Sequence, residues 1–164
     1  MAIKVLGLDI STEKISYVLL SDDQINKYGE VFSPLRGPKG GVIKNPLAML
    51  KSFESLLLEL KPQIVYIEGL AWIKNRSSFI SIAKVLGGLE FVCFSNDIEF
   101  VVVEGRVWKS ALLMRGNAQK EEIKEWVILE GKASEQIGKE DPFESQDLYD
   151  AYCIARYGNS KEQK

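Results

Sequence analysis

Four acidic residues stand at positions where a folded chain could bring them together. Asp9 and Glu68 each end a short apolar run of the kind that forms a buried strand. Asp147 and Asp150 are three positions apart near the start of a predicted helix, so they share one face of it. In α/β sheets ligands bind at the ends of strands. If the two strands are parallel neighbours, the four carboxylates would meet at one edge.

Such a cluster of like charges is destabilising unless protons or cations compensate it. Two divalent ions about 4 Å apart would do so, and they would also activate a water and stabilise the leaving oxygen in phosphodiester cleavage. Each acid alone has a plainer explanation. A strand-end acid is usually a solvated turn residue, and Asp147 and Asp150 would offset the dipole of a helix capped by Ser145. The combination favours a metal site.

The composition narrows the chemistry of that site. The 164 residues suit one domain, and 46% apolar with 27% charged residues is typical of a folded, soluble protein. The chain has no histidine, and Cys93 and Cys153 stand singly in apolar surroundings. Zinc sites and His-dependent nucleophiles are therefore nearly excluded, and a bound metal would have oxygen ligands, which favours magnesium, manganese or calcium.

The order of the predicted elements is that of an α/β fold. We predict strands at residues 3–9, 15–20, 24–32, 64–68 and 98–103, and helices at 47–60, 77–94, 106–114, 119–129 and 147–157. Three meandering strands followed by alternating helices and strands make a mixed five-stranded sheet flanked by helices. Loops are expected at 33–46 and 130–146. One domain would cover residues 1–158, followed by a frayed, charged tail at 159–164.

The predicted helix at 77–94 is apolar nearly all round. We expect one face in the core and another against a partner chain. The pair Gly87-Gly88 in its middle predicts close approach by another element, because glycine there costs helix stability.

Three short motifs at these intervals resemble those of the RuvC-type Holliday junction resolvases, which have the RNase H-like fold: Gly7-Leu8-Asp9, Val65-Tyr66-Ile67-Glu68 and Asp147-Leu148-Tyr149-Asp150-Ala151. The resemblance covers residues 3 to about 157. It implies an endonuclease that cuts four-way DNA junctions as a homodimer through helix 77–94, with two Mg²⁺ or Mn²⁺ ions per active site. The implied catalytic metal ligands are Asp9, Glu68, Asp147 and Asp150, and the implied phosphate contacts are Lys109 and Lys120.

Two departures indicate a divergent member, of phage or mobile-element type. Ile10-Ser11 stand where cellular members usually have Pro-Gly after the first Asp. Ala71 stands at the place of the family's aromatic wedge, and Trp72 is next along.

The middle of the chain is the expected DNA-binding surface. The net charge of −2 conceals a segment, residues 70–124, in which eight Lys and Arg outnumber six Asp and Glu. Trp72, Lys74 and Arg76 closely follow Glu68, and the tryptophan could stack on an unpaired base. Alternatively, Trp72 fills core space and the two cations are solvated.

We therefore predict a metal-dependent, structure-selective endonuclease for branched DNA. Rival hypotheses are a nuclease of the same fold acting on forks, flaps or RNA–DNA hybrid, and a non-catalytic junction binder. An actin-like ATPase is disfavoured by the short chain. The N-terminus lacks a signal-peptide pattern, and we expect no apolar stretch of the roughly 20 residues that a membrane span needs. These features predict a cytoplasmic protein with no membrane partner.

Overall fold

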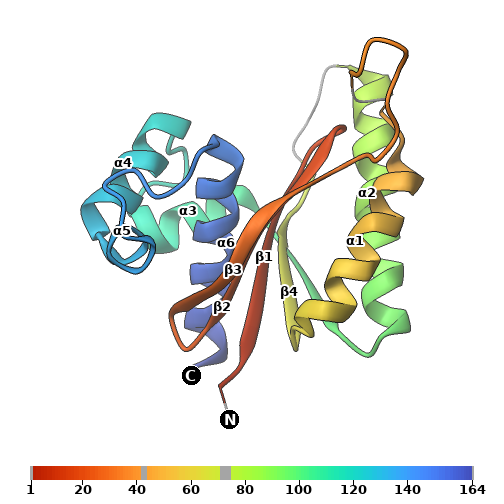
Figure 1. Cartoon of the computed structure of the whole chain (residues 1–164). Helices are drawn as coiled ribbons and strands as arrows, with labels where there is room; N and C mark the ends of the chain where they lie inside the picture. The colour runs from red at the N-terminus through yellow and green to blue at the C-terminus, as the bar shows by residue number, and fades with distance from the viewer. Residues whose placement is uncertain (1, 42–43, 71–74, 164) are drawn as a thin grey trace.

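The computed structural model describes residues 2–41, 44–70 and 75–163, and its centre is a mixed five-stranded sheet in the order β3-β2-β1-β4-β5 (Figure 1). The strands are β1 (Lys4–Ile10), β2 (Lys14–Ser21), β3 (Gln24–Phe32), β4 (Ile64–Glu68) and β5 (Glu99–Val103). The first three form an antiparallel meander, whereas β4 pairs in parallel with both β1 and β5. The predicted fold is confirmed, and β1 and β4 are the parallel neighbours that a shared acidic edge requires.

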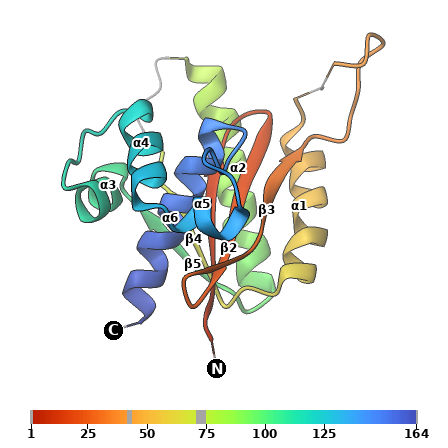
Figure 2. The same cartoon turned by 60° about the vertical axis from the view of Figure 1, so that its left-hand side comes forward.

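Helices cover both faces of this sheet and complete a three-layer architecture (Figures 1 and 2). One face carries α1 (Pro46–Leu60) and α2 (Arg76–Ser95). The other carries α3 (Gly105–Leu113), α4 (Lys120–Glu130), α5 (Lys132–Ile137) and α6 (Gln146–Glu162). Successive side chains of a strand point to opposite faces. Val5 and Tyr66 therefore pack with α6, whereas Leu6 and Ile67 pack with α1 and α2.

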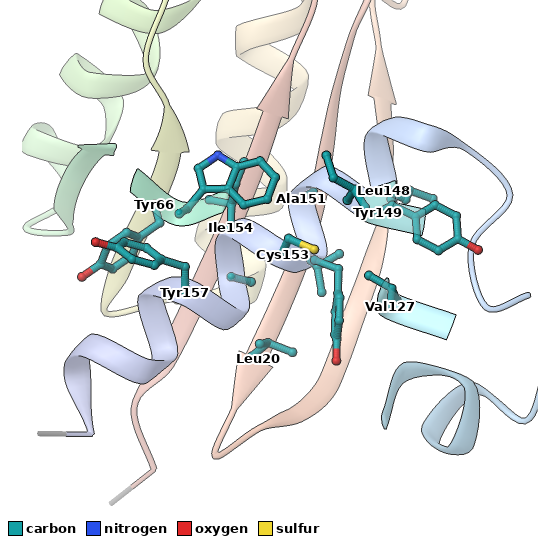
Figure 3. Close-up of a cluster of buried hydrophobic side chains, with 14 of the residues drawn as sticks. Leu20, Tyr66, Val127, Leu148, Tyr149, Ala151, Cys153, Ile154 and Tyr157 are labelled. Carbon is teal, nitrogen blue, oxygen red and sulfur yellow. The ribbon is translucent and has the colours of Figure 1, made fainter. Parts of the chain in front are cut away.

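Helix α6 packs tightly against the sheet, across β1. Figure 3 shows this core, in which inward residues of α6 lie against Leu20 and Tyr66 of the sheet and Val127 of α4. The close approach depends on Gly7, because a Cβ there would lie less than 3.0 Å from backbone atoms of Ala151 and Ala155. The glycine of the first sequence motif therefore allows α6 to pack closely against β1.

Several sequence-based expectations about the helices are wrong. The polar segment 130–146 is not all loop, since it contains α5. Helix α6 runs on to Glu162, so the expected fraying after Gly158 does not occur over the described residues. Burial of Asn159, whose side-chain amide donates to Asp23, explains this extension.

The expectations for α2 are partly met. Gly88 does sit against a neighbouring element, where a Cβ would clash with Leu50 of α1, whereas a Cβ on Gly87 would meet no heavy atom of the described residues within 4 Å. The expectation that no apolar stretch is long enough for a membrane span is wrong by length and composition alone, because α2 has 20 residues and its most apolar window has a mean hydropathy of 1.5. It is a single such helix among the described residues.

Candidate active site

A row of polar side chains crosses four strands on the face covered by α6. Asp9 of β1 lies opposite Ser16 of β2, and Ser16 lies opposite Glu30 of β3. On the other side of β1, Leu8 is paired with Ile67, and Asp9 and Glu68 are the next residues along the two parallel strands. The alternation of side chains places all four residues of the row on one face. Three carboxylates are thus brought together by strand register alone.

Helix α6 adds two more carboxylates from its first turns. Ser145 caps the helix, since its hydroxyl accepts a hydrogen bond from the backbone N–H of Leu148. Asp147 and Asp150 follow on the same face of the helix. Gln146 donates from Nε2 to Oδ1 of Asp150 at 3.3 Å, while Oδ2 of Asp147 pairs with Nζ of Lys14 at 3.0 Å.

The acidic ends of β1 and β4 and the first turns of α6 meet around a cavity of about 350 Å³. Its lining includes three of the four predicted metal ligands and both predicted phosphate contacts: Asp9, Glu68, Asp150, Lys109 and Lys120. Asp147 is not among its lining residues. Three acids and two lysines therefore line the cavity, and the fourth acid is paired with Lys14.

The electrostatics of this cavity reflect crowded negative charge. Burial raises the pKa of Asp9 well above its ordinary value, and the neighbouring carboxylates of Asp150, Asp147 and Glu68 raise it further. Burial also raises the pKa of Asp150 to about 6, with Glu68 adding to the shift, while the hydrogen bond from Gln146 and the lysines oppose it. The acids thus interact electrostatically, as the sequence-based hypothesis required.

Glu68 is held by groups that the sequence did not point to. Nε1 of Trp108, a fully buried residue of α3, donates to Oε2 of Glu68 at 2.7 Å. Gly105, the first residue of α3, leaves room for the same carboxylate, because a Cβ there would lie 2.8 Å from Oε1. Forty residues separate Trp108 from Glu68, and no local pattern signals such a contact.

The donor chemistry fits divalent ions that prefer oxygen. The four carboxylates supply hard oxygen ligands, and both cysteines are buried in the cores. As the side chains stand, however, no group of three metal-ligating side chains within the described ranges is arranged to hold an ion. Glu68 and Asp147 are engaged by Trp108 and Lys14 instead. Glu68 could keep the hydrogen bond from Trp108 through Oε2 and ligate an ion through Oε1, whereas Oδ2 of Asp147 would have to leave Lys14 to become a ligand.

The predicted DNA-binding residues are only partly placed. Lys109 and Lys120 line the cavity, and Lys109 also lies over the ring of Trp108, with Nζ 5.3 Å from the ring centroid. Arg76 is exposed at the first turn of α2 and is not among the residues that line the cavity. Trp72 and Lys74 lie outside the described residues. A second cavity, of about 410 Å³, shares Glu68 and Lys109 with the first and adds Arg106.

The chain is similar to RuvC proteins in both sequence and structure. It is 24% identical over 155 residues to the crossover junction endodeoxyribonuclease RuvC of Carboxydothermus hydrogenoformans, covering 94% of each chain. Its fold matches that of Thermus thermophilus RuvC with a TM-score of 0.72 at 15% identity, covering 98% of this chain and 96% of the other.

The T. thermophilus protein in complex with Holliday junction substrate is matched equally well, at TM-score 0.72 and 16% identity over 94% of this chain and 92% of the other. The fowlpox virus resolvase, solved with Holliday junction DNA, is similar at TM-score 0.60 and 8% identity over 99% and 100% of the two chains. No family model matches the sequence. The similarity spans the whole domain, and the resemblance inferred from the three motifs is confirmed.

Proposed function

We propose that this chain, a divergent RuvC-type protein of the RNase H-like fold, is a metal-dependent endonuclease that cuts four-way DNA junctions. The observation that carries the proposal is the meeting of Asp9, Glu68 and Asp150 around one cavity, with Asp147 close enough to raise the pKa of Asp9. Strand register and the packing of α6 on β1 both contribute to this meeting. The junction-bound relatives support the choice of substrate.

The residues of the site have distinct proposed roles. Asp9, Glu68, Asp147 and Asp150 would hold two ions, Mg²⁺ or Mn²⁺. Such ions, when bound, supply an activated water and stabilise the leaving oxygen of a phosphodiester. Lys109 and Lys120 would donate to phosphate oxygens at the rim of the cavity and position the strand. Trp108 would keep Glu68 at the edge of the sheet through its indole N–H.

The exposed side of α2 supports a homodimer. Val85, Leu89 and Cys93 pack into the core, while Phe91 and Phe94 are 69% and 81% exposed on the same helix. A second copy would cover this apolar surface, and a two-fold dimer would place two sites on opposing strands. We propose this use of α2 rather than a membrane span, because the helix is already anchored to α1 and the sheet. The proposed location is the cytoplasm.

A labelled synthetic four-way junction tests the proposal directly. Wild-type protein should make paired nicks near the crossover with Mg²⁺ or Mn²⁺ and none with EDTA. Asp9→Asn should abolish cutting and retain junction binding. The matched control is Asp97→Asn, an exposed aspartate in the turn before β5 at the opposite edge of the sheet, which should cut normally.

The same assay separates the rivals. Cutting of forks, flaps or RNA–DNA hybrid in preference to the junction would keep the site and replace the substrate. Junction binding without cutting under every metal would indicate a non-catalytic binder. Binding should also weaken steeply with salt, since phosphate contacts release counterions, and a Lys120→Ala variant should lower the salt slope by about one.

A further inference from the structure

Lys14 is shared between two carboxylates on different elements. Its Nζ lies 2.7 Å from Oε1 of Glu30 on β3 and 3.0 Å from Oδ2 of Asp147 on α6. Lys14 and Glu30 are each 19% exposed at the side chain, and Asp147 is 28% exposed. The group is therefore a partly buried triad at the edge of the acidic cavity.

Glu30 is the member of this triad with the most side-chain hydrogen bonds. Besides Lys14, its Oε1 accepts hydrogen bonds from the hydroxyls of Ser16 on β2 and Ser145 at the cap of α6. It thereby ties the start of α6 to the sheet. One partner of Lys14, Glu30, is therefore held by further hydrogen bonds, whereas the other, Asp147, could also bind a cation in the cavity.

We propose that Lys14 is an electrostatic latch that holds Asp147 in place of a divalent cation. Three of the four acids line the cavity and the fourth is paired with Lys14. For Asp147 to ligate a cation through Oδ2, the cation must displace the ammonium group. This inference rests on the proposed metal site, and it adds that Lys14 competes with the metal ion for Asp147.

Lys14 would not lose all its partners in this exchange. When Asp147 turns to a cation, the ammonium group keeps its ion pair with Glu30, so no charge is left unpaired at this partly buried position. In the absence of a cation, the same lysine compensates one of the four acids and stabilises the fold. The latch thus has opposite effects on the metal-free protein and on metal binding.

Titration of free Mn²⁺ by electron paramagnetic resonance tests the latch without any cleavage assay. Lys14→Met should bind Mn²⁺ about tenfold more tightly than wild type, because the ion no longer competes with an ammonium group for Asp147 or meets its positive charge, and should melt at a lower temperature in EDTA. Lys14→Arg should restore wild-type values for both. Lys27→Met removes the same charge from an exposed pair with Glu59 and should leave Mn²⁺ affinity unchanged.

Glu30→Gln gives a test of opposite sign. Glutamine can still accept from Ser16 and Ser145, but Lys14 then has only Asp147 as an ionic partner, so Mn²⁺ should bind more weakly than to wild type. Unchanged or weaker Mn²⁺ binding by Lys14→Met would overturn the latch.

The failure of the proposed metal site is recognised separately. If wild type and Asp9→Asn bind Mn²⁺ equally, there is no ion at this site, and both proposals fall. If Asp9→Asn loses binding while Lys14→Met matches wild type, the metal site stands and only the latch is wrong.

Discussion

Gly7 of β1 lies against the backbone of Ala151 of α6. Gly7 is two residues before Asp9 on the strand, and Ala151 directly follows Asp150 on the helix. This contact sets how closely the helix bearing Asp147 and Asp150 approaches the strand bearing Asp9. The same glycine belongs to one of the three motifs that resemble those of RuvC-type resolvases. Its importance is therefore steric, and it acts on the site through the position of α6.

Gly7→Ala should push α6 away from β1 and separate its acids from Asp9. Overpacking of a core costs about 1–3 kcal/mol or more of unfolding free energy, which in a chain of this size lowers the melting temperature by about 2–4 °C per kcal/mol. Junction cutting should fall as well. Gly41→Ala, at a position where a Cβ meets no described atom within 4 Å, is the control. A wild-type melting temperature for Gly7→Ala would contradict the steric role.

Trp108→Phe should remove the indole donor from Glu68 while keeping most of the buried ring. Loss of a hydrogen bond to a charged group costs about 1.5–3 kcal/mol, and loss of an outer contact to a metal ligand typically costs about 10–100-fold in metal affinity or activity. Thermal melting and Mn²⁺ titration measure the two effects. Trp126→Phe, on α4 at the edge of the same core, is the control. Equal Mn²⁺ affinity in both variants would show that Trp108 is only a core residue.

The pH dependence of stability should reveal the crowded carboxylates in metal-free protein. Asp150 has a pKa raised to about 6 from 3.8, so the folded state binds protons that the unfolded chain has released. Its stabilising contribution is complete below pH 3.8 and is lost as the pH rises through 6. Asp150→Asn should therefore be more stable than wild type at pH 7.5 in EDTA, by up to about 3 kcal/mol at about 1.4 kcal/mol per pKa unit.

Melting curves from pH 4 to pH 8 check this prediction, with Asp97→Asn as the control. The gap between Asp150→Asn and wild type should widen with rising pH. The difference between the two proteins is the useful quantity, because lowered pKa values at Glu30 and Asp23 oppose the trend at the acid end. A gap that stays constant with pH would refute the raised pKa.

Phe91→Glu should convert the proposed dimer to a monomer. The side chain is 69% exposed on α2, so the change costs little in the folded monomer but places charge in an apolar interface. Light scattering after size exclusion measures the mass. Leu129→Glu makes the same kind of change at a 78% exposed position on α4 and should remain dimeric. A wild-type mass for Phe91→Glu would exclude this face of α2 from the interface.

Much of the scaffold could be predicted because its signals are local. Apolar runs marked the five strands, helical spacing marked α1 and α2, and the acids at the ends of β1 and β4 marked one edge of the sheet. Segment α5 was missed because its six residues are too few and too polar for a periodic pattern. The full length of α6 was missed because distant contacts stabilise its last turns, including the hydrogen bond from Tyr66 to Glu162.

The side chains that could ligate a metal are readable from the sequence, because residue type and strand or helix period are properties of short segments. Which of these acids line the cavity, and which one pairs with Lys14, depends on tertiary contacts. The register of β1 with β4 and the packing of α6 on Gly7 place three acids at one cavity, and the β2–β3 pairing delivers Lys14 and Glu30 to the fourth. These contacts join residues tens to more than a hundred positions apart, so no local pattern encodes them.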